Sequence, residues 1–242
     1  LYTSNQSAYQ LNIPVETMID KVMDYLQHQF EDEEVIFLSI DNLAEKDVIP
    51  LLRKSMINSK GKDKVHEISM ETLSTETLEE MMESGKSYLI IPTNSSKSMV
   101  ARINFGLKEL KNNREDIKIS LFGYPEWITY QNDYKDFFKA LNTTIYSRFY
   151  ANEESVEYKD FENQYNDNFN CSLMNAVPVF GALGYDLGNA ILNEIINIDS
   201  TTFEGVQNVI NFTNKNNTVK GNVNDAIFII NFDSDGINRI IR

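Results

Sequence analysis

Apolar residues in the first part of the chain follow two spacings, one typical of helices and one typical of buried strands. Between Pro14 and Phe30 they recur at helical intervals, which predicts an amphipathic helix. The run from Val35 to Ile40 is almost continuously apolar, which predicts a strand covered on both faces. A second helical stretch is predicted from about Leu43 to Asn58, and Pro50 inside it should kink or shorten its first part.

The same pairing of strand and helix recurs as far as Gly123. Strands are predicted over 65–70, 87–92 and 117–122, and helices over 74–83 and from Ser95 or Ser96 to Leu110. Strand-to-helix units of about 25 to 30 residues are typical of parallel strands joined by crossover helices. The pattern therefore predicts an α/β fold in which helices cover both faces of a doubly wound parallel sheet.

After Gly123 the pattern becomes less regular. A further strand is predicted over 143–150, a loop over 214–224, and helices over 155–169, 179–196 and 202–212. Two last apolar runs, 226–232 and 237–241, flank Ser234-Asp235-Gly236, which favours a tight turn. These runs predict a closing β-hairpin.

Composition excludes several classes of protein. The 242 residues are 42% hydrophobic and 24% charged, as in an ordinary globular chain with a sizeable core. The net charge of −14 argues against a nucleic-acid binder, whose affinity comes from clustered Lys and Arg. No apolar run approaches the roughly 20 residues that span a bilayer. We therefore expect no nucleic-acid partner and no integral membrane segment.

The supply of reactive residues limits catalysis and metal binding. One cysteine and two histidines, His28 and His66, almost exclude a zinc site and a disulfide framework. Neither a dinucleotide fingerprint nor a P-loop follows a predicted strand, and no nucleophile elbow is present. We expect no enzymatic activity, no metal and no cofactor, and we interpret Cys171 as a small buried thiol.

Candidate binding residues lie where the predicted strands end, which is where ligands bind in open α/β sheets. They are Asp41, Asn42, Thr93, Asn94, Tyr124, Glu126 and Trp127. The two aromatic residues offer apolar contact area with a polar tip, and the Glu126 carboxylate would pair with an ammonium group. In the alternative interpretation, Pro125 shapes a turn, Trp127 fills the core and the polar residues cap helices.

Several segments, taken in order, resemble the type I periplasmic binding-protein family, as in the branched-chain amino-acid-binding proteins of bacterial ABC importers. The segments that carry the resemblance are Val35 to Asp41, Gly123-Tyr-Pro-Glu126, Phe180-Gly-Ala-Leu-Gly-Tyr-Asp-Leu-Gly188, Phe203-Glu-Gly205 and Phe232-Asp-Ser-Asp-Gly236. Taken together, Leu121-Phe-Gly-Tyr-Pro-Glu-Trp127 and Phe180-Gly-Ala-Leu-Gly-Tyr-Asp186 are moreover similar to the version in Bacteroidetes envelope proteins, where it often follows LysM peptidoglycan-binding repeats.

The resemblance implies two α/β lobes joined by crossovers, with one lobe complete in this sequence and the other partial. Residues 1–12 would form a crossover segment, 13–150 with 219–242 the complete lobe, and 151–218 a helical remnant of the other lobe. Glu126 matches the position where amino-acid-binding members place an acid on the ammonium group of the ligand. Thr93, Asn94 and Tyr124 match positions that offer further contacts.

We therefore expect a non-catalytic extracytoplasmic protein of the periplasm or cell envelope. It would bind a small solute, either an amino acid or a peptidoglycan fragment, between its lobes. The alternative is a protein-interaction or regulatory module of the cell-wall machinery, with an envelope protein as partner and a binding cleft that has lost its role.

Overall fold

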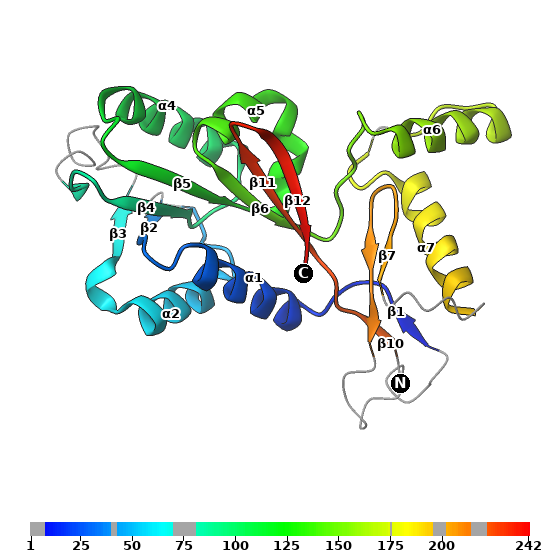
Figure 1. Ribbon diagram of the computed structural model, residues 1–242, viewed down its shortest axis with the longest axis horizontal. Helices are drawn as coiled ribbons and strands as arrows, with labels where there is room; N and C mark the ends of the chain where they lie inside the picture. The colour runs from blue at the N-terminus through cyan, green and yellow to red at the C-terminus, as the bar shows by residue number, and fades with distance from the viewer. Residues whose placement is uncertain (1–7, 40–42, 70–80, 175, 196–201, 214–221) are drawn as a thin grey trace. The chain divides into compact units, whose positions relative to one another are not determined.

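The computed structural model describes residues 8–39, 43–69, 81–174, 176–195, 202–213 and 222–242 (Figure 1). The chain divides into two units. Unit 1 comprises 1–18, 147–229 and 240–242, and unit 2 comprises 19–146 and 230–239. The helix predicted over 74–83 and the loop predicted over 214–224 lie largely outside the described residues.

A seven-stranded, mostly parallel sheet runs through unit 2. Its strands lie in the order β12-β11-β6-β5-β4-β2-β3, and the pairs β2–β3, β2–β4, β4–β5 and β5–β6 are parallel. The strands are β2 (Glu34–Ser39), β3 (Val65–Ser69), β4 (Ser87–Pro92), β5 (Lys118–Gly123), β6 (Thr143–Ser147), β11 (Phe228–Asp233) and β12 (Gly236–Ile241). Every strand predicted from the apolar runs is confirmed. The inner strands β2, β4 and β6 are largely buried, as expected of strands covered on both faces, whereas the edge strands β3 and β12 are partly exposed.

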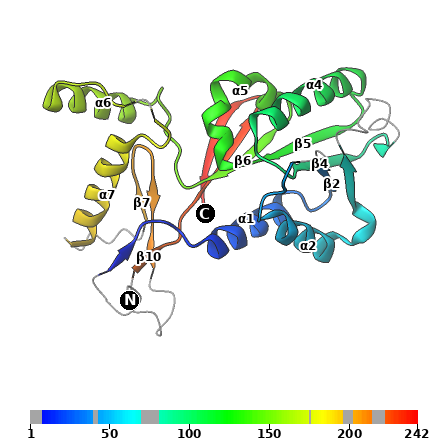
Figure 2. The same cartoon turned by 180° about the vertical axis from the view of Figure 1, so that it is seen from behind.

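Helices cover both faces of this sheet. Helices α4 and α5 lie on one side, and α1 and α2 lie on the other, as Figures 1 and 2 both show. The helices are α1 (Val15–Gln29), α2 (Ile49–Lys60), α4 (Lys97–Asn113) and α5 (Gln131–Ala140), with short 3₁₀ helices η2 (Lys62–Lys64) and η3 (Pro125–Tyr130). The predicted doubly wound α/β layer is therefore confirmed.

Helix α2 begins later than the apolar spacing predicts. Its first residue is Ile49, and Pro50 lies in its first turn. Proline is tolerated there because the N–H groups of a first helical turn have no acceptor within the helix. Pro50 therefore marks the start of the helix rather than a kink, and residues 43–48 form part of the loop after β2.

The closing hairpin is confirmed. Strands β11 and β12 are joined by Ser234 and Asp235. Asp233 Oδ1 accepts hydrogen bonds from the backbone N–H groups of Asp235 (2.9 Å) and Gly236 (3.0 Å). Gly236 has a φ of 146°, a conformation that residues with a side chain rarely adopt.

The described residues of unit 1 form two helices and two small sheets. The first sheet has the order β1-β10-β9, and in the second β7 pairs antiparallel with β8. The elements are β1 (Tyr9–Gln10), α6 (Val156–Phe169), α7 (Phe180–Ile195), β7 (Phe203–Glu204), β8 (Val209–Ile210), β9 (Phe212–Thr213) and β10 (Asn222–Asn224). The two predicted helices over 155–169 and 179–196 are confirmed.

The helix predicted over 202–212 is wrong, because these residues form β7, β8 and the start of β9. The buried carboxylate of Asp186 accepts the backbone N–H groups of Val206 (2.8 Å), Gln207 (2.9 Å) and Asn208 (2.7 Å). These bonds hold the segment between β7 and β8 as a turn. Gly205 permits the approach, since a Cβ there would lie 2.1 Å from Asp186 Oδ1.

The interpretation of Cys171 as a buried thiol is also wrong. Cys171 is exposed, and it follows the last turn of α6. Helix α6 ends at Phe169 and is followed by Asn170, which has a left-handed backbone conformation with a φ of 51°. The chain leaves the helix through a polar, exposed turn, so no apolar surroundings enclose the thiol.

Candidate functional site

The strand order of the large sheet reverses beside β2. The chain passes from β2 to β3 on one side and then returns to place β4 on the other side of β2. In open α/β sheets, ligands bind outside the carboxyl ends of the strands at such a reversal. The loops that follow β2 and β4 therefore flank the expected binding position, and the loop after β5 follows next along the sheet.

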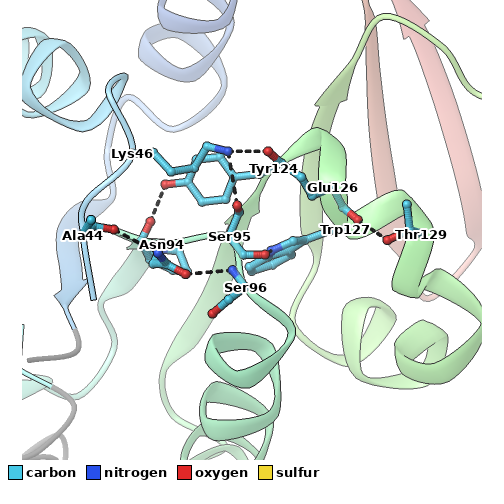
Figure 3. A network of polar contacts seen from close by, with 10 residues as sticks. Ala44, Lys46, Asn94, Ser95, Ser96, Tyr124, Glu126, Trp127 and Thr129 are labelled. Carbon is cyan, nitrogen blue, oxygen red and sulfur yellow. Dashed lines mark hydrogen bonds and ion pairs between the residues drawn. The ribbon is translucent and has the colours of Figure 1, made fainter. Parts of the chain in front are cut away.

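Hydrogen bonds tie the loops after β2 and β4 together (Figure 3). The backbone N–H of Lys46 donates to the carbonyl of Thr93 at 2.9 Å, and Asn94 Nδ2 donates to the carbonyl of Ala44 at 2.9 Å. Asn94 Oδ1 also accepts the backbone N–H of Ser96 at 2.8 Å. Ser96 in turn caps α4, as the sequence predicts for Ser95 or Ser96. Asn94 therefore holds the shape of this edge.

Tyr124 and Trp127 lie inside unit 2, and both side chains are fully buried. The Tyr124 hydroxyl donates to the carbonyl of Pro92, and burial raises the pKa of this phenol well above its usual value. The Trp127 ring stacks on Phe138 with 5.5 Å between centroids, and its Nε1 donates to the carbonyl of Ser95 at 3.1 Å. Trp127 therefore fills the core, as the alternative interpretation holds, and a contact of either residue with a ligand stays a prediction.

Glu126 lies at the surface, and its partner is a lysine from another loop. Lys46 Nζ lies 2.5 Å from Glu126 Oε1 and 3.2 Å from Ser95 Oγ. The same nitrogen stands over the Tyr124 ring, 5.1 Å from its centroid. We call these four residues, Lys46, Ser95, Tyr124 and Glu126, the ammonium cluster (Figure 3). The sequence predicted an ammonium partner for Glu126, and in the structure this partner belongs to the chain itself.

The structure brings together most of the candidate residues. Thr93 and Asn94 lie on the loop that follows β4, and Tyr124, Glu126 and Trp127 follow β5, the last two within η3. Thr93 is buried, and its backbone N–H donates to the carbonyl of Leu38 at 2.7 Å. Asp41 and Asn42 lie outside the described residues. Ligand binding by all seven stays a prediction.

Sequence reasoning missed Lys46, because it placed residues 43–58 in one helix. The signal that could have found it is Pro50, whose preference for a first helical turn moves the helix start and leaves Lys46 in a loop at the strand ends. Ser95 contributes twice to this site, since its hydroxyl accepts a hydrogen bond from the Lys46 ammonium and its carbonyl accepts one from the Trp127 indole N–H.

The chemistry of the ammonium cluster is that of cation recognition. A carboxylate, a hydroxyl and an aromatic face surround one primary ammonium. Among the described residues, no group of three or more His, Cys, Asp or Glu side chains could hold a metal ion. Within the same residues, no helix is long and apolar enough to span a membrane.

Solved structures share the arrangement of strands and helices. Over 93% of its length the chain is similar to the periplasmic ligand-binding protein of a branched-chain amino-acid ABC transporter from Burkholderia xenovorans LB400, with 12% identity, a TM-score of 0.54 and 62% of that chain covered. An amino-acid ABC transporter substrate-binding protein from Pseudomonas fluorescens Pf-5 matches over 96% of this chain and 64% of its own, with 10% identity and a TM-score of 0.52. The chain has the type I periplasmic binding-protein fold.

The likeness to type I periplasmic binding proteins is one of fold alone at these identities. The chain spans about 62 to 66% of the length of the first structures that it matches. No protein-family model and no curated protein matches the sequence.

Proposed function

We propose that the chain is a non-catalytic, extracytoplasmic solute-binding or receptor-like protein. Its ligand, an amino acid or a cell-wall fragment, is held at the carboxyl ends of β2, β4 and β5. The observation that supports this proposal is the ammonium cluster, which gathers charged and hydroxyl groups from three loops at the reversal of strand order. The solved structures that share the fold are named as ligand- or substrate-binding proteins of ABC transporters.

The proposal includes a division of the chain by role. Residues 13–150 with 219–242 form the lobe that carries the ammonium cluster, 1–12 form a crossover, and 151–218 belong to a second lobe. A place in the periplasm or cell envelope, and kinship with the Bacteroidetes envelope version that follows LysM repeats, are part of the same proposal. Peptidoglycan fragments belong on the list of ligands for that reason.

A thermal-shift screen tests the proposal. The chain is mixed with aliphatic, polar and charged amino acids and with muropeptides, each at increasing concentration. A ligand at about 100 times its Kd stabilises the folded state by about 2.7 kcal/mol. For a chain of this size that corresponds to a rise in Tm of roughly 5–10 °C. If no member of the panel gives a saturable rise, the proposal is overturned.

Two variants decide whether a responding ligand uses the proposed edge. Glu126→Gln keeps the size of the side chain and removes its charge, so the Tm rise of an amine-bearing ligand should shrink. Lys97→Ala removes a lysine that pairs with Asp133 at 2.6 Å elsewhere on unit 2, and it should leave the response unchanged. A response that Glu126→Gln leaves intact would place that ligand somewhere else.

A further inference from the structure

The ammonium cluster has the composition of a ligand site, yet a side chain of the protein fills it. We infer that Lys46 is a built-in occupant of a site for a primary ammonium group, so that an amine-bearing ligand binds there only by displacing the Lys46 side chain. Lys46 is then the residue that determines which charge the site accepts. The inference rests on the proposed function, because it assumes that this edge of the sheet receives the ligand.

Three different contacts recognise the Lys46 ammonium. Glu126 Oε1 lies 2.5 Å from Nζ and accepts a charge-assisted hydrogen bond from it. Ser95 Oγ accepts a second bond at 3.2 Å. The Tyr124 ring presents its face at 5.1 Å, within the distance of a cation–π interaction. A carboxylate, a neutral acceptor and a π face form a cage that fits a primary ammonium.

The walls of this cage are held by bonds that do not involve Lys46. The Tyr124 hydroxyl is anchored on the carbonyl of Pro92, and the ring packs edge-on against Trp127 with 6.0 Å between centroids. The carbonyl of Ser95 accepts the indole N–H of Trp127. The carbonyl of Glu126 accepts the Thr129 hydroxyl at 2.6 Å. The cage should therefore keep its shape when Lys46 is removed. A ligand that binds to a preformed site spends less free energy on ordering side chains.

A second lysine pair of unit 2 shows what an ordinary surface pair looks like. Lys97 Nζ lies 2.6 Å from Asp133 Oδ2 and 5.8 Å from the centroid of the Tyr130 ring. The Lys97 side chain is 55% exposed, whereas the Lys46 side chain is 23% exposed. The two pairs thus share a carboxylate and a ring but differ in enclosure. Lys97 is therefore the matched control for Lys46.

The internal lysine lowers the affinity for any external amine. The apparent Kd equals the intrinsic Kd divided by the fraction of molecules in which the site is free. Because Lys46 is tethered to the site, its effective concentration there is high. An external amine therefore gains access chiefly when the Lys46 side chain is removed or is drawn to another anion.

Chemical complementation tests the inference without a known ligand. Lys46→Ala removes the last three carbon atoms of the side chain and the ammonium group. The ion n-propylammonium supplies the same three carbons and ammonium group in free form. Trp127 is the single tryptophan of the chain and bonds to Ser95, so its fluorescence reports on the site. We expect saturable binding of n-propylammonium to Lys46→Ala, with an apparent Kd at least about tenfold lower than for the wild-type chain at constant ionic strength.

The control measurements isolate the cage. Lys46→Ala combined with Glu126→Gln should lose the saturable binding, n-propanol should give none with any variant, and Lys97→Ala should behave as wild type. Far-UV circular dichroism establishes that each variant is folded, and Lys46→Ser serves as the opened variant if Lys46→Ala does not fold.

Three outcomes overturn the inference. In the first, n-propylammonium does not saturate Lys46→Ala, or its substitute Lys46→Ser, below about 100 mM. In the second, it binds the wild-type chain as tightly as that variant. In the third, it binds Lys97→Ala as tightly as that variant. The two proposals can fail separately. If the solute panel fails while n-propylammonium binds Lys46→Ala, the solute-binding function falls and the ammonium site stands. If a solute of the panel binds while n-propylammonium does not bind Lys46→Ala, the solute-binding function stands and the ammonium site falls.

Discussion

Units 1 and 2 bury different kinds of side chain. The largest fully buried side chains of the described residues are mainly those of unit 2, with Trp127, Tyr88, Tyr124, Phe37, Phe122 and Phe138 among them. In unit 1, several buried side chains are polar, namely Ser147, Asp186, Gln207, Asn208, Asn224 and Asp225. Unit 2 should therefore respond to lost volume, and unit 1 to lost hydrogen bonds.

The two units also expose different amounts of apolar surface. In the described part of unit 1 the exposed large apolar side chains are Tyr9, Val15, Val156, Phe169, Met174, Val177, Phe180, Tyr185 and Leu192. In the described part of unit 2 they are Leu43, Leu51, Met81 and Phe105. Among the described residues, unit 1 thus places polar groups inside and rings outside more often than unit 2.

The largest effect should follow from removing ring volume in unit 2. Trp127→Ala deletes a fully buried indole that stacks on Phe138, and it should lower the free energy of unfolding by about 3–5 kcal/mol. Urea denaturation followed by circular dichroism measures the loss. Trp127→Phe keeps a stacked ring and should cost less than half as much. A loss below about 1 kcal/mol for the alanine variant would contradict a volume-dependent core.

The next effect should follow from removing one carboxylate in unit 1. Asp186→Ala leaves the backbone N–H groups of Val206, Gln207 and Asn208 without their acceptor, so it should cost about 3 kcal/mol. Amide hydrogen exchange at these three residues should speed up more than exchange in unit 2. Asp167→Ala removes an exposed carboxylate from α6 and should change stability by about 0.5 kcal/mol or less. Equal losses of stability from the two variants would contradict the expectation that unit 1 is sensitive to lost buried hydrogen bonds.

A smaller effect should appear in the pH dependence of unit 1. Burial raises the pKa of Asp186, and the three backbone N–H donors offset only part of that rise. The folded state then binds the proton more tightly than the unfolded state. This contribution to stability is fully present below the unfolded-state pKa and is lost as the pH rises through the folded-state pKa.

Comparison with Asp186→Asn, whose side chain does not titrate, isolates this group. Denaturant midpoints of both proteins are measured from acid to neutral pH. The difference between the wild-type chain and the variant should shift in favour of the variant as the pH rises. A shift in favour of the wild-type chain would mean that the N–H donors outweigh burial.

The smallest effect should come from the exposed rings of unit 1. Phe169→Ser and Phe180→Ser change side chains that are 66% and 61% exposed, so each should alter the free energy of unfolding by about 0.5 kcal/mol or less. Both should reduce the binding of a hydrophobic dye. Phe161→Ser, on α6 like Phe169 but buried, should cost about 3 kcal/mol. A large loss from the exposed pair would show that these rings hold unit 1 together.

The fold of unit 2 could be predicted because its information is local. Each strand is an apolar run, and the apolar residues of each helix recur at helical spacing. The prediction of such an element does not depend on a residue far away in the chain. The turn between β7 and β8 depends on Asp186, some twenty positions earlier in the chain. No local pattern contains that contact, which is why a helix was predicted where strands form.

The candidate site was predicted only in part, because some of its contacts also join residues far apart in the chain. The rule that ligands bind at strand ends led to Glu126 and its neighbours. It did not lead to Lys46, because the pairing of Lys46 with Glu126 joins two loops that lie 80 positions apart. The rule also could not separate exposed from buried members, and it grouped the surface Glu126 with the core residue Trp127.

The position of β11 between β6 and β12 bears on synthesis by the ribosome. About 80 residues separate the end of β6 at Ser147 from the start of β11 at Phe228, and translation at 5–20 residues per second takes about 4–16 s to cover them. During that interval β6 is an edge strand, and the backbone N–H and C=O groups that later pair with β11 are unpaired. The nascent chain therefore passes through a window in which a chaperone, or another unpaired strand, has access to the large sheet.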